Sequence, residues 1–276
     1  MTVPVGPDGA LEVYSAVGDA FAGRRIGFGR RRAALAANFA RHRGRDDAAV
    51  AASWVAGLLA EIGCAAAADA PGETQPAGPS GPLPTDPDAP LHGAHLVAAL
   101  PGLPAGAADL VRWHRERDDG TGFPDRLRWD GIPADAAALG IAHAFLELVE
   151  DEGEPRGPQE AVFAITAESG RAYAVELVRA FREFIAAAPD RWDAPPSFAL
   201  PALDDEVVST ALNSGGRQTV PSGTSTTAVA LTPCDRATAA ADRVAAALGP
   251  DRIAAARAGA CVHAARAFFH LTGAPA

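Results

Sequence analysis

The sequence of 276 residues predicts an all-α protein. Alanine-rich segments that repeat apolar residues at three-to-four spacing cover most of the chain, which is the pattern of amphipathic helices. Loops rich in glycine and proline separate these segments. A different pattern, rich in Thr, Ser and Val, is confined to residues 206–232. The chain is long enough to bury a sizeable core.

The first half of the chain predicts six helices in order. Three of them lie at residues 11–22, 30–41 and 47–62, and Gly63 ends the third. The stretch at 70–90 is so rich in Pro and Gly that it cannot continue a helix. Helices are expected again at 91–100, 105–117 and, after a glycine loop, at 134–149.

The second half predicts two more helices before the pattern changes, at residues 159–168 and 174–188. Residues 206–232 form either a short β-hairpin or an irregular excursion, and two closing helices are expected at 236–248 and 251–271. We therefore divide the chain into a helical domain, a proline-rich linker and a C-terminal extension, at residues 1–188, 189–204 and 205–276.

Composition excludes several classes of protein. A net charge of −10 and a pI near 5.1 argue against nucleic-acid and anionic-membrane binding. No apolar run reaches the roughly 20 residues of a membrane helix, and the N-terminus lacks a basic start and an apolar stretch, so a cytoplasmic location is expected. The three cysteines, Cys64, Cys234 and Cys261, are too far apart for a zinc knuckle and predict buried thiols.

The stretch H-R-E-R-D-D-G-T-G-F-P, from His114 to Pro124, is the strongest functional signal. Its two glycines permit a tight backbone path, and exposed amides in such a loop can bind phosphate oxygens. By itself the pattern is weak, because similar loops are common as plain turns. The residues around it make the signal more specific, since Gly131-Ile132-Pro133 follows just before a helix.

This region resembles the HD-GYP family of cyclic di-GMP phosphodiesterases, which belongs to the larger HD superfamily. The family pattern HHExxDGxGYP is followed by IP and a helix, as here. The segment L-L-A-E-I-G-C at residues 58–64 lies where the family has LLHDIGK, and the resemblance extends over about residues 11–184. It implies an HD-type helical bundle and, in active members, divalent metals that activate water for phosphodiester hydrolysis.

Most of the metal ligands that the resemblance implies are replaced in this chain. The paired His-Asp becomes Ala60-Glu61, the double His becomes His114-Arg115, and the late Asp becomes His143. The early His falls near Gly29 and a further one at Ala89, with His92 and His95 nearby. Glu61, His114 and His143 keep ligand chemistry and could hold one iron or manganese ion, as the catalytic site of an active enzyme.

We favour the alternative that no metal and no catalytic residue is present, because a fixed cation at Arg115 repels a dication. Arg115 could instead bind phosphate with Arg117, Asp119, Gly120 and Gly122, helped by Arg126 or Arg128. A salt bridge from Arg115 to Glu61 or Asp118 is the competing interpretation.

The aromatic residues of this region carry separate expectations. In the family, the loop at 119–124 contacts protein partners, which makes Phe123 and Pro124 candidates for an interaction, although a Phe folded inward is the commoner case. Trp113 and Trp129 are expected to be packing residues.

The C-terminal extension gives only weak functional signals. Cys261, His263 and His270 have poor spacing for a metal site, so satisfied histidines on a core-facing helix are expected. Asn213 to Arg217 is expected to be a hairpin turn and alternatively an anion nest. The apolar face at 254–269 packs on the helical domain or forms a homodimer contact.

Together these observations predict a catalytically degenerate HD-GYP-like protein. We expect a regulatory or protein-interaction module that binds cyclic di-GMP or another phosphorylated nucleotide without hydrolysis. The alternatives are an active metal-dependent phosphodiesterase with a mononuclear site and a purely structural partner protein.

Overall fold

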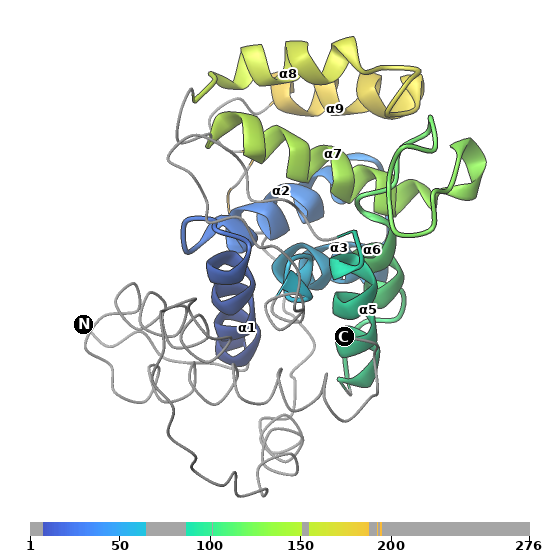
Figure 1. Ribbon diagram of the computed structural model, residues 1–276. Helices are drawn as coiled ribbons and strands as arrows, with labels where there is room; N and C mark the ends of the chain where they lie inside the picture. Colours follow the sequence, from blue (N-terminus) through green and yellow to red (C-terminus); the bar gives the residue numbers. More distant parts are fainter. Residues whose placement is uncertain are drawn as a thin grey trace, which may run out of the picture.

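A computed structural model describes residues 8–64, 87–100, 102–150, 155–187, 192 and 194. Within these residues the regular structure is helical, which confirms the all-α prediction (Figure 1). The helices are α1 (Asp8–Phe21), α2 (Phe28–His42), α3 (Asp47–Leu59), α5 (Ala89–Ala99), α6 (Ala107–Trp113), α7 (Ala134–Val149), α8 (Pro158–Ala167) and α9 (Val175–Ala187), with a short 3-10 turn at Trp129–Gly131.

The predicted helix at 105–117 is four residues too long at its C-terminal end, because α6 ends at Trp113. The backbone after that point hydrogen-bonds to loops instead of continuing the helix. The amide of Phe123 donates to the carbonyl of Arg115 over 3.3 Å, and the amide of Asp118 donates to the carbonyl of Ala172 over 3.1 Å. This early end releases His114 and the residues after it into a loop.

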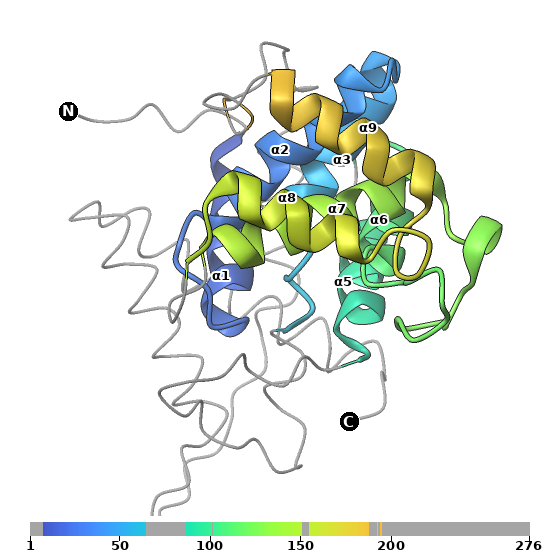
Figure 2. The ribbon, with the colours of Figure 1, turned by 90° about the horizontal axis from the view of Figure 1, so that it is seen from above.

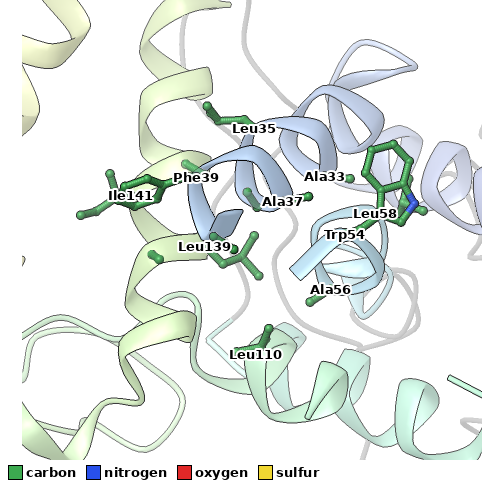
Figure 3. Packing of buried hydrophobic residues seen from close by; sticks show 14 of the residues in the cluster. Ala33, Leu35, Ala37, Phe39, Trp54, Ala56, Leu58, Leu110, Leu139 and Ile141 are labelled. Carbon is green, nitrogen blue, oxygen red and sulfur yellow. The ribbon is translucent and has the colours of Figure 1, made fainter. Parts of the chain in front are cut away.

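Helices α2 and α3 form the centre of the bundle, and small residues let them approach closely. A Cβ atom added at Gly57 on α3 would lie 2.5 Å from the Cα of Ala33 on α2. Figure 3 shows the surrounding packing, with Leu35 and Phe39 of α2 directed toward α7 and Phe39 beside Ile141. Helix α2 is therefore covered by α3 on one side and by α7 on another.

Helices α8 and α9 form a further layer on α7, as Figures 1 and 2 show. The ring of Phe181 on α9 packs edge-on against Phe39 and Phe145, with centroids 5.1 and 5.4 Å apart. Trp192, which follows α9, packs against Phe145, and the Asn38 amide donates to its carbonyl over 3.2 Å. Core contacts therefore continue past residue 188.

The C-terminal expectations lie outside the described residues. These are the hairpin or excursion at 206–232, the turn at 213–217, the helices at 236–248 and 251–271, and the residues Cys234, Cys261, His263 and His270. Among the helices that the structure describes, none is both long and apolar enough to span a bilayer.

Candidate functional site

The structure brings together the three side chains that were singled out as surviving ligand types. Glu61 follows α3, His114 follows α6, and His143 lies in the middle of α7; all three are buried. His143 Nε2 is 3.6 Å from Glu61 Oε1. The rings of His114 and His143 have centroids 5.5 Å apart. Helices α2, α3, α6 and α7 converge here.

Three arginines surround the Glu61 carboxylate. Arg32 Nη1 lies 3.1 Å from Oε2, while Arg115 Nη2 and Arg24 Nε lie 3.2 and 3.5 Å from Oε1. The salt bridge between Arg115 and Glu61 was one of the two interpretations of the sequence. Arg24 and Arg32 were not anticipated at all, and they make the site far more cationic than the sequence suggested.

Arg32 is held rigidly in the interior. Its side chain is fully buried, its Nε donates to the carbonyl of Gly57 over 2.8 Å, and its Nη1 is 3.1 Å from His143 Nδ1. The guanidinium also lies over the ring of Phe28, 5.4 Å from the centroid. Because arginine stays protonated in proteins, this is a permanent buried charge.

Glu147, one turn after His143 on α7, is the second carboxylate of the site. Its Oε1 is 3.0 Å from His143 Nε2 and 3.4 Å from Arg115 Nη1, and it also pairs with Arg24. We call Arg24, Arg32, Glu61, Arg115, His143 and Glu147 the Glu61 cluster. Sequence analysis did not find Glu147, although its i, i+4 spacing from His143 places both on one helix face.

Asp19 on α1 is a further buried acid beside the cluster. Its two carboxylate oxygens accept hydrogen bonds from the amides of Gly27 and Gly29, each over 2.9 Å, at the start of α2. Gly29, where the early family histidine was placed, has no room for a side chain, since its Cβ would lie 2.3 Å from Ser15 Oγ. Helix α2 contributes Arg32 to this region and no side chain from position 29.

The pKa values show how charge is distributed at neutral pH. Burial alone would raise the pKa of Glu61, but Arg32, His143, Arg115 and Arg24 outweigh it and lower the pKa to about 2. For Glu147, burial is likewise outweighed, by His143 and then Arg115 and Arg24, so its pKa lies well below the usual value. Both carboxylates are therefore ionised.

The pKa values of the two buried histidines and of Asp19 shift so that each group favours its neutral form. Burial and then Arg115 lower the pKa of His143 to about 4 and that of His114 well below its usual value. Burial raises the pKa of Asp19 to about 7, against the opposing effect of Arg32. Three guanidinium charges thus face two firmly ionised carboxylates.

A divalent metal does not fit this set of side chains. The carboxylate oxygens of Glu61 that would bind a metal already face Arg32, Arg115 and Arg24. In the part of the chain that the structure describes, which includes His92 and His95, no group of three or more His, Cys, Asp or Glu is placed to hold a metal ion. His114 Nδ1 contacts the carbonyl of Val111 over 2.7 Å, and its Nε2 has no hydrogen-bond partner among the described residues.

The glycine loop is closed by its own hydrogen bonds. The amide of Gly120 donates to the carbonyl of Arg117 over 2.8 Å, and Asp119 accepts from the amide of Thr121 over 3.0 Å. Gly120 has a φ of 75°, and a Cβ at Gly122 would lie 2.4 Å from the amide nitrogen of Arg117. The glycines are therefore required by the fold of the loop, and the Gly120 amide is not available to a phosphate.

Arg117 and the aromatic residues complete this region. Arg117 Nη2 is 2.8 Å from Glu168, and its Nε is 3.8 Å from Asp119. Phe123 and Pro124 are half-buried, and Trp113 packs against the core while its indole donates to Asp125 over 2.7 Å. The expectation that Trp129 is a packing residue is wrong, because 70% of it is exposed.

Comparison with known proteins identifies the family. The HD domain model matches residues 22–177, which is more than half of the chain. A cyclic GMP-AMP specific phosphodiesterase of V. cholerae has a similar structure, with 16% identity, a TM-score of 0.57 and coverage of 91% of this chain and 69% of that one. At this identity the likeness shows the fold.

A second solved structure, an HDG"Y"P protein from Bdellovibrio bacteriovorus, has 20% identity and a TM-score of 0.44. The match covers 58% of this chain and 51% of that one, so the chain spans about half the length of that relative. No curated protein matches. The family model and the helical architecture agree with the resemblance that the motifs indicated, and the chain belongs to the HD domain family.

Proposed function

We propose that this HD domain protein works without a catalytic metal, as a regulatory or protein-interaction module and not as a hydrolase. The observation that carries the proposal is the set of three guanidinium groups within 3.5 Å of the Glu61 carboxylate. They supply the positive charge that metal ions supply in active members of the resembled family, and they cannot be deprotonated.

The energetic argument uses the repulsion between cations. Two unit charges about 4 Å apart interact by roughly 4 kcal/mol at an effective dielectric constant of about 20, and a dication doubles that figure. Arg32 cannot move away to relieve it, because its Nε is bound to Gly57 and its side chain is fully buried. A metal at Glu61 would therefore have to overcome repulsion from a fixed charge.

Elemental analysis of the purified full chain, together with a hydrolysis assay on cyclic di-GMP, tests this proposal. We expect substoichiometric iron and manganese and no hydrolysis. Stoichiometric metal that is lost in Glu61→Ala and retained in Glu12→Ala, a carboxylate outside the cluster, would instead establish the mononuclear site at Glu61, His114 and His143. That result would support the active phosphodiesterase.

Non-hydrolytic binding of a cyclic dinucleotide is a second candidate function. Its support is the partial exposure of Arg24, Arg115 and Arg117, whose side chains are 23%, 17% and 31% accessible. To bind phosphate, Arg115 would exchange its contacts with Glu61 and Glu147 for the ligand, with Arg117 as a second guanidinium at the edge of the site. The V. cholerae neighbour, described as specific for cyclic GMP-AMP, makes this compound class a reasonable choice of probe.

Calorimetric titration with cyclic di-GMP tests this second candidate. Binding should weaken at least tenfold in Arg115→Gln and stay unchanged in Arg179→Gln, an exposed arginine on α9 that pairs with Glu176. Absence of heat at high micromolar ligand would remove the nucleotide role and leave the interaction role. For that role we propose the loop at 119–124, with Phe123 and Pro124, as one contact with a protein partner. We also propose that the chain can form a homodimer, which light scattering tests.

A further inference from the structure

A concave surface lies apart from the Glu61 cluster and shares no lining residue with it. It is a cavity of about 950 Å³ between the end of the glycine loop, the start of α7 and the first turns of α9. Figure 2 shows the loop that precedes α7 at the same end of the bundle as the start of α9. We call this cavity the Trp129 groove. Its volume is at the upper end of the range for ligand pockets, about 300–1,000 Å³.

The floor of the Trp129 groove is apolar, and an exposed aromatic lies at its edge. Ile132, Leu177 and Ala180 line it together with Trp129. Trp129 is 70% exposed and has a φ of 53°, a backbone conformation that bulky residues rarely adopt. An exposed tryptophan on a strained backbone is a feature of recognition surfaces, where Trp is enriched among the residues that dominate binding.

Two carboxylates that line the Trp129 groove have no ion pair among the described residues. Two lining arginines are committed to acids, because Arg43 pairs with Asp135 over 3.0 Å and Arg171 pairs with Glu168. Asp118 and Asp130 also line the groove, and neither has an ion pair among the described residues.

Asp118 is also partly desolvated. It is half-buried, and burial followed by the neighbouring Asp119 raises its pKa. A cation placed beside it would stabilise its ionised form. Arg128 is the lining arginine without an ion pair in the described part of the chain. It is the single positive charge set against Asp118 and Asp130, because Asp119 pairs with Arg117 and Glu176 pairs with Arg179. The groove therefore carries an excess of negative charge over an apolar floor.

We propose that the Trp129 groove binds a segment of a partner protein that presents an arginine or lysine among apolar residues. The cationic head would lie between the Trp129 ring and the carboxylates of Asp118 and Asp130, a combination of cation–π and ionic contacts. Its aliphatic stem and the flanking apolar residues would cover Ile132 and Leu177. Phosphorylated ligands are disfavoured, since they would meet unpaired carboxylates.

This inference rests on the proposed interaction role and gives the partner a chemistry. The net charge of −10 adds a long-range attraction for a basic segment. The proposed binding at the Trp129 groove does not depend on whether the Glu61 cluster binds metals or nucleotides. Elemental analysis and calorimetry therefore test those two points separately.

Nuclear magnetic resonance on the full, ¹⁵N-labelled chain tests the proposal. The probe is a blocked hexapeptide of two Leu-Arg-Ala repeats, and the indole N–H signal of Trp129, assigned with Trp129→Phe, is the readout. We expect a saturable shift of that signal, at least tenfold weaker binding to the Asp118→Asn, Asp130→Asn double variant, and weaker binding at high salt. Phe163→Ala, at an aromatic on α8 that is 77% exposed and does not line the groove, should bind as the natural chain does.

Several outcomes would overturn the proposal. One is an unshifted Trp129 signal with the basic peptide; another is equal binding of a hexapeptide of two Leu-Glu-Ala repeats. A loss of binding in Phe163→Ala as large as in the double variant would show nonspecific contact with exposed aromatics. Competition of cyclic di-GMP for the Trp129 signal would assign the groove to a nucleotide. Asp130→Asn alone, at an exposed position, keeps the test decisive if the double variant does not fold.

Discussion

Glu61 is the carboxylate that Arg24, Arg32 and Arg115 share, and its replacement gives the sharpest test at the scale of single residues. Glu61→Gln keeps the shape of the side chain and leaves the buried Arg32 charge short of a partner. Removing one member of a buried ion pair costs about 3–5 kcal/mol. Chemical denaturation should show this loss, while Glu12→Gln, at a partly exposed residue, should change the free energy of unfolding by less than about 0.5 kcal/mol. A loss below about 1 kcal/mol for Glu61→Gln would contradict the arrangement.

His143 predicts a pH dependence of stability. Its pKa falls from 6.5 to about 4 on folding, so the folded state binds fewer protons than the unfolded state between these values. Its contribution to stability is present above pH 6.5 and is lost as the pH falls through 4, by on the order of 3 kcal/mol. Asp19 acts in the opposite sense, because its pKa rises from 3.8 to about 7, and its contribution is lost as the pH rises through 7.

The variant His143→Gln isolates the histidine term. The difference in unfolding free energy between the natural chain and this variant should shrink by about 3 kcal/mol from pH 7 to pH 4. Denaturation series at several pH values measure it, with His95→Gln, at an exposed histidine, as the control. A difference that does not vary with pH would show that His143 is not buried in its neutral form.

The site could be predicted only where a motif marked its residues. His114, Arg115 and His143 were found through their offsets from the glycine loop. Arg32 was missed, although Phe28, Arg32, Leu35 and Phe39 follow one helix stripe at spacings of four, three and four. An arginine within an apolar stripe is a sign of a buried, paired charge, and that sign was present. Nothing in the sequence indicated that Arg24 contacts the same carboxylate. Arg24 lies in a loop, where no helical repeat of apolar residues indicates the direction of a side chain.

At the scale of elements, the contact between α2 and α3 depends on Gly57. Alanine normally favours a helix over glycine by about 1 kcal/mol. Here the added Cβ would lie 2.5 Å from the Cα of Ala33, and overpacking of this kind costs about 1–3 kcal/mol. Gly57→Ala should therefore lower the thermal midpoint. Gly131→Ala, where the nearest atom is Leu127 Cβ at 3.9 Å, is the matched control and should not. An unchanged midpoint for Gly57→Ala would show that the two helices can separate without cost.

Helix positions were predictable because an apolar stripe and its flanking loops are local features. The segments at 134–149 and 159–168 differ from α7 and α8 by at most one residue at either end. The end of α6 was not predictable, since it depends on a hydrogen bond from Phe123 to Arg115 that closes only when the loop folds back. The exposure of Trp129 could not be predicted from the sequence for a related reason. A tryptophan normally indicates packing, and its positive φ is set by the loop around it.

At the scale of the whole molecule, the metal-free proposal predicts how stability responds to added ions. A ligand present at about 100 times its dissociation constant stabilises the folded state by about 2.7 kcal/mol. For a protein of this size that corresponds to a rise in thermal midpoint of roughly 5–10 °C. We expect manganese, iron and EDTA each to leave the midpoint of the purified chain unchanged. A drop in the midpoint with EDTA that manganese restores would refute the proposal.

Because the positive charge around Glu61 comes from guanidinium groups, it does not depend on the supply of metal ions. A guanidinium is covalently part of the chain, so it cannot be chelated, exchanged or oxidised as a transition ion can. Iron starvation or exposure to peroxide would leave the charge of the Glu61 cluster unchanged. On the metal-free proposal, a function that depends on this cluster would persist under conditions that remove the ion from a metal-dependent site.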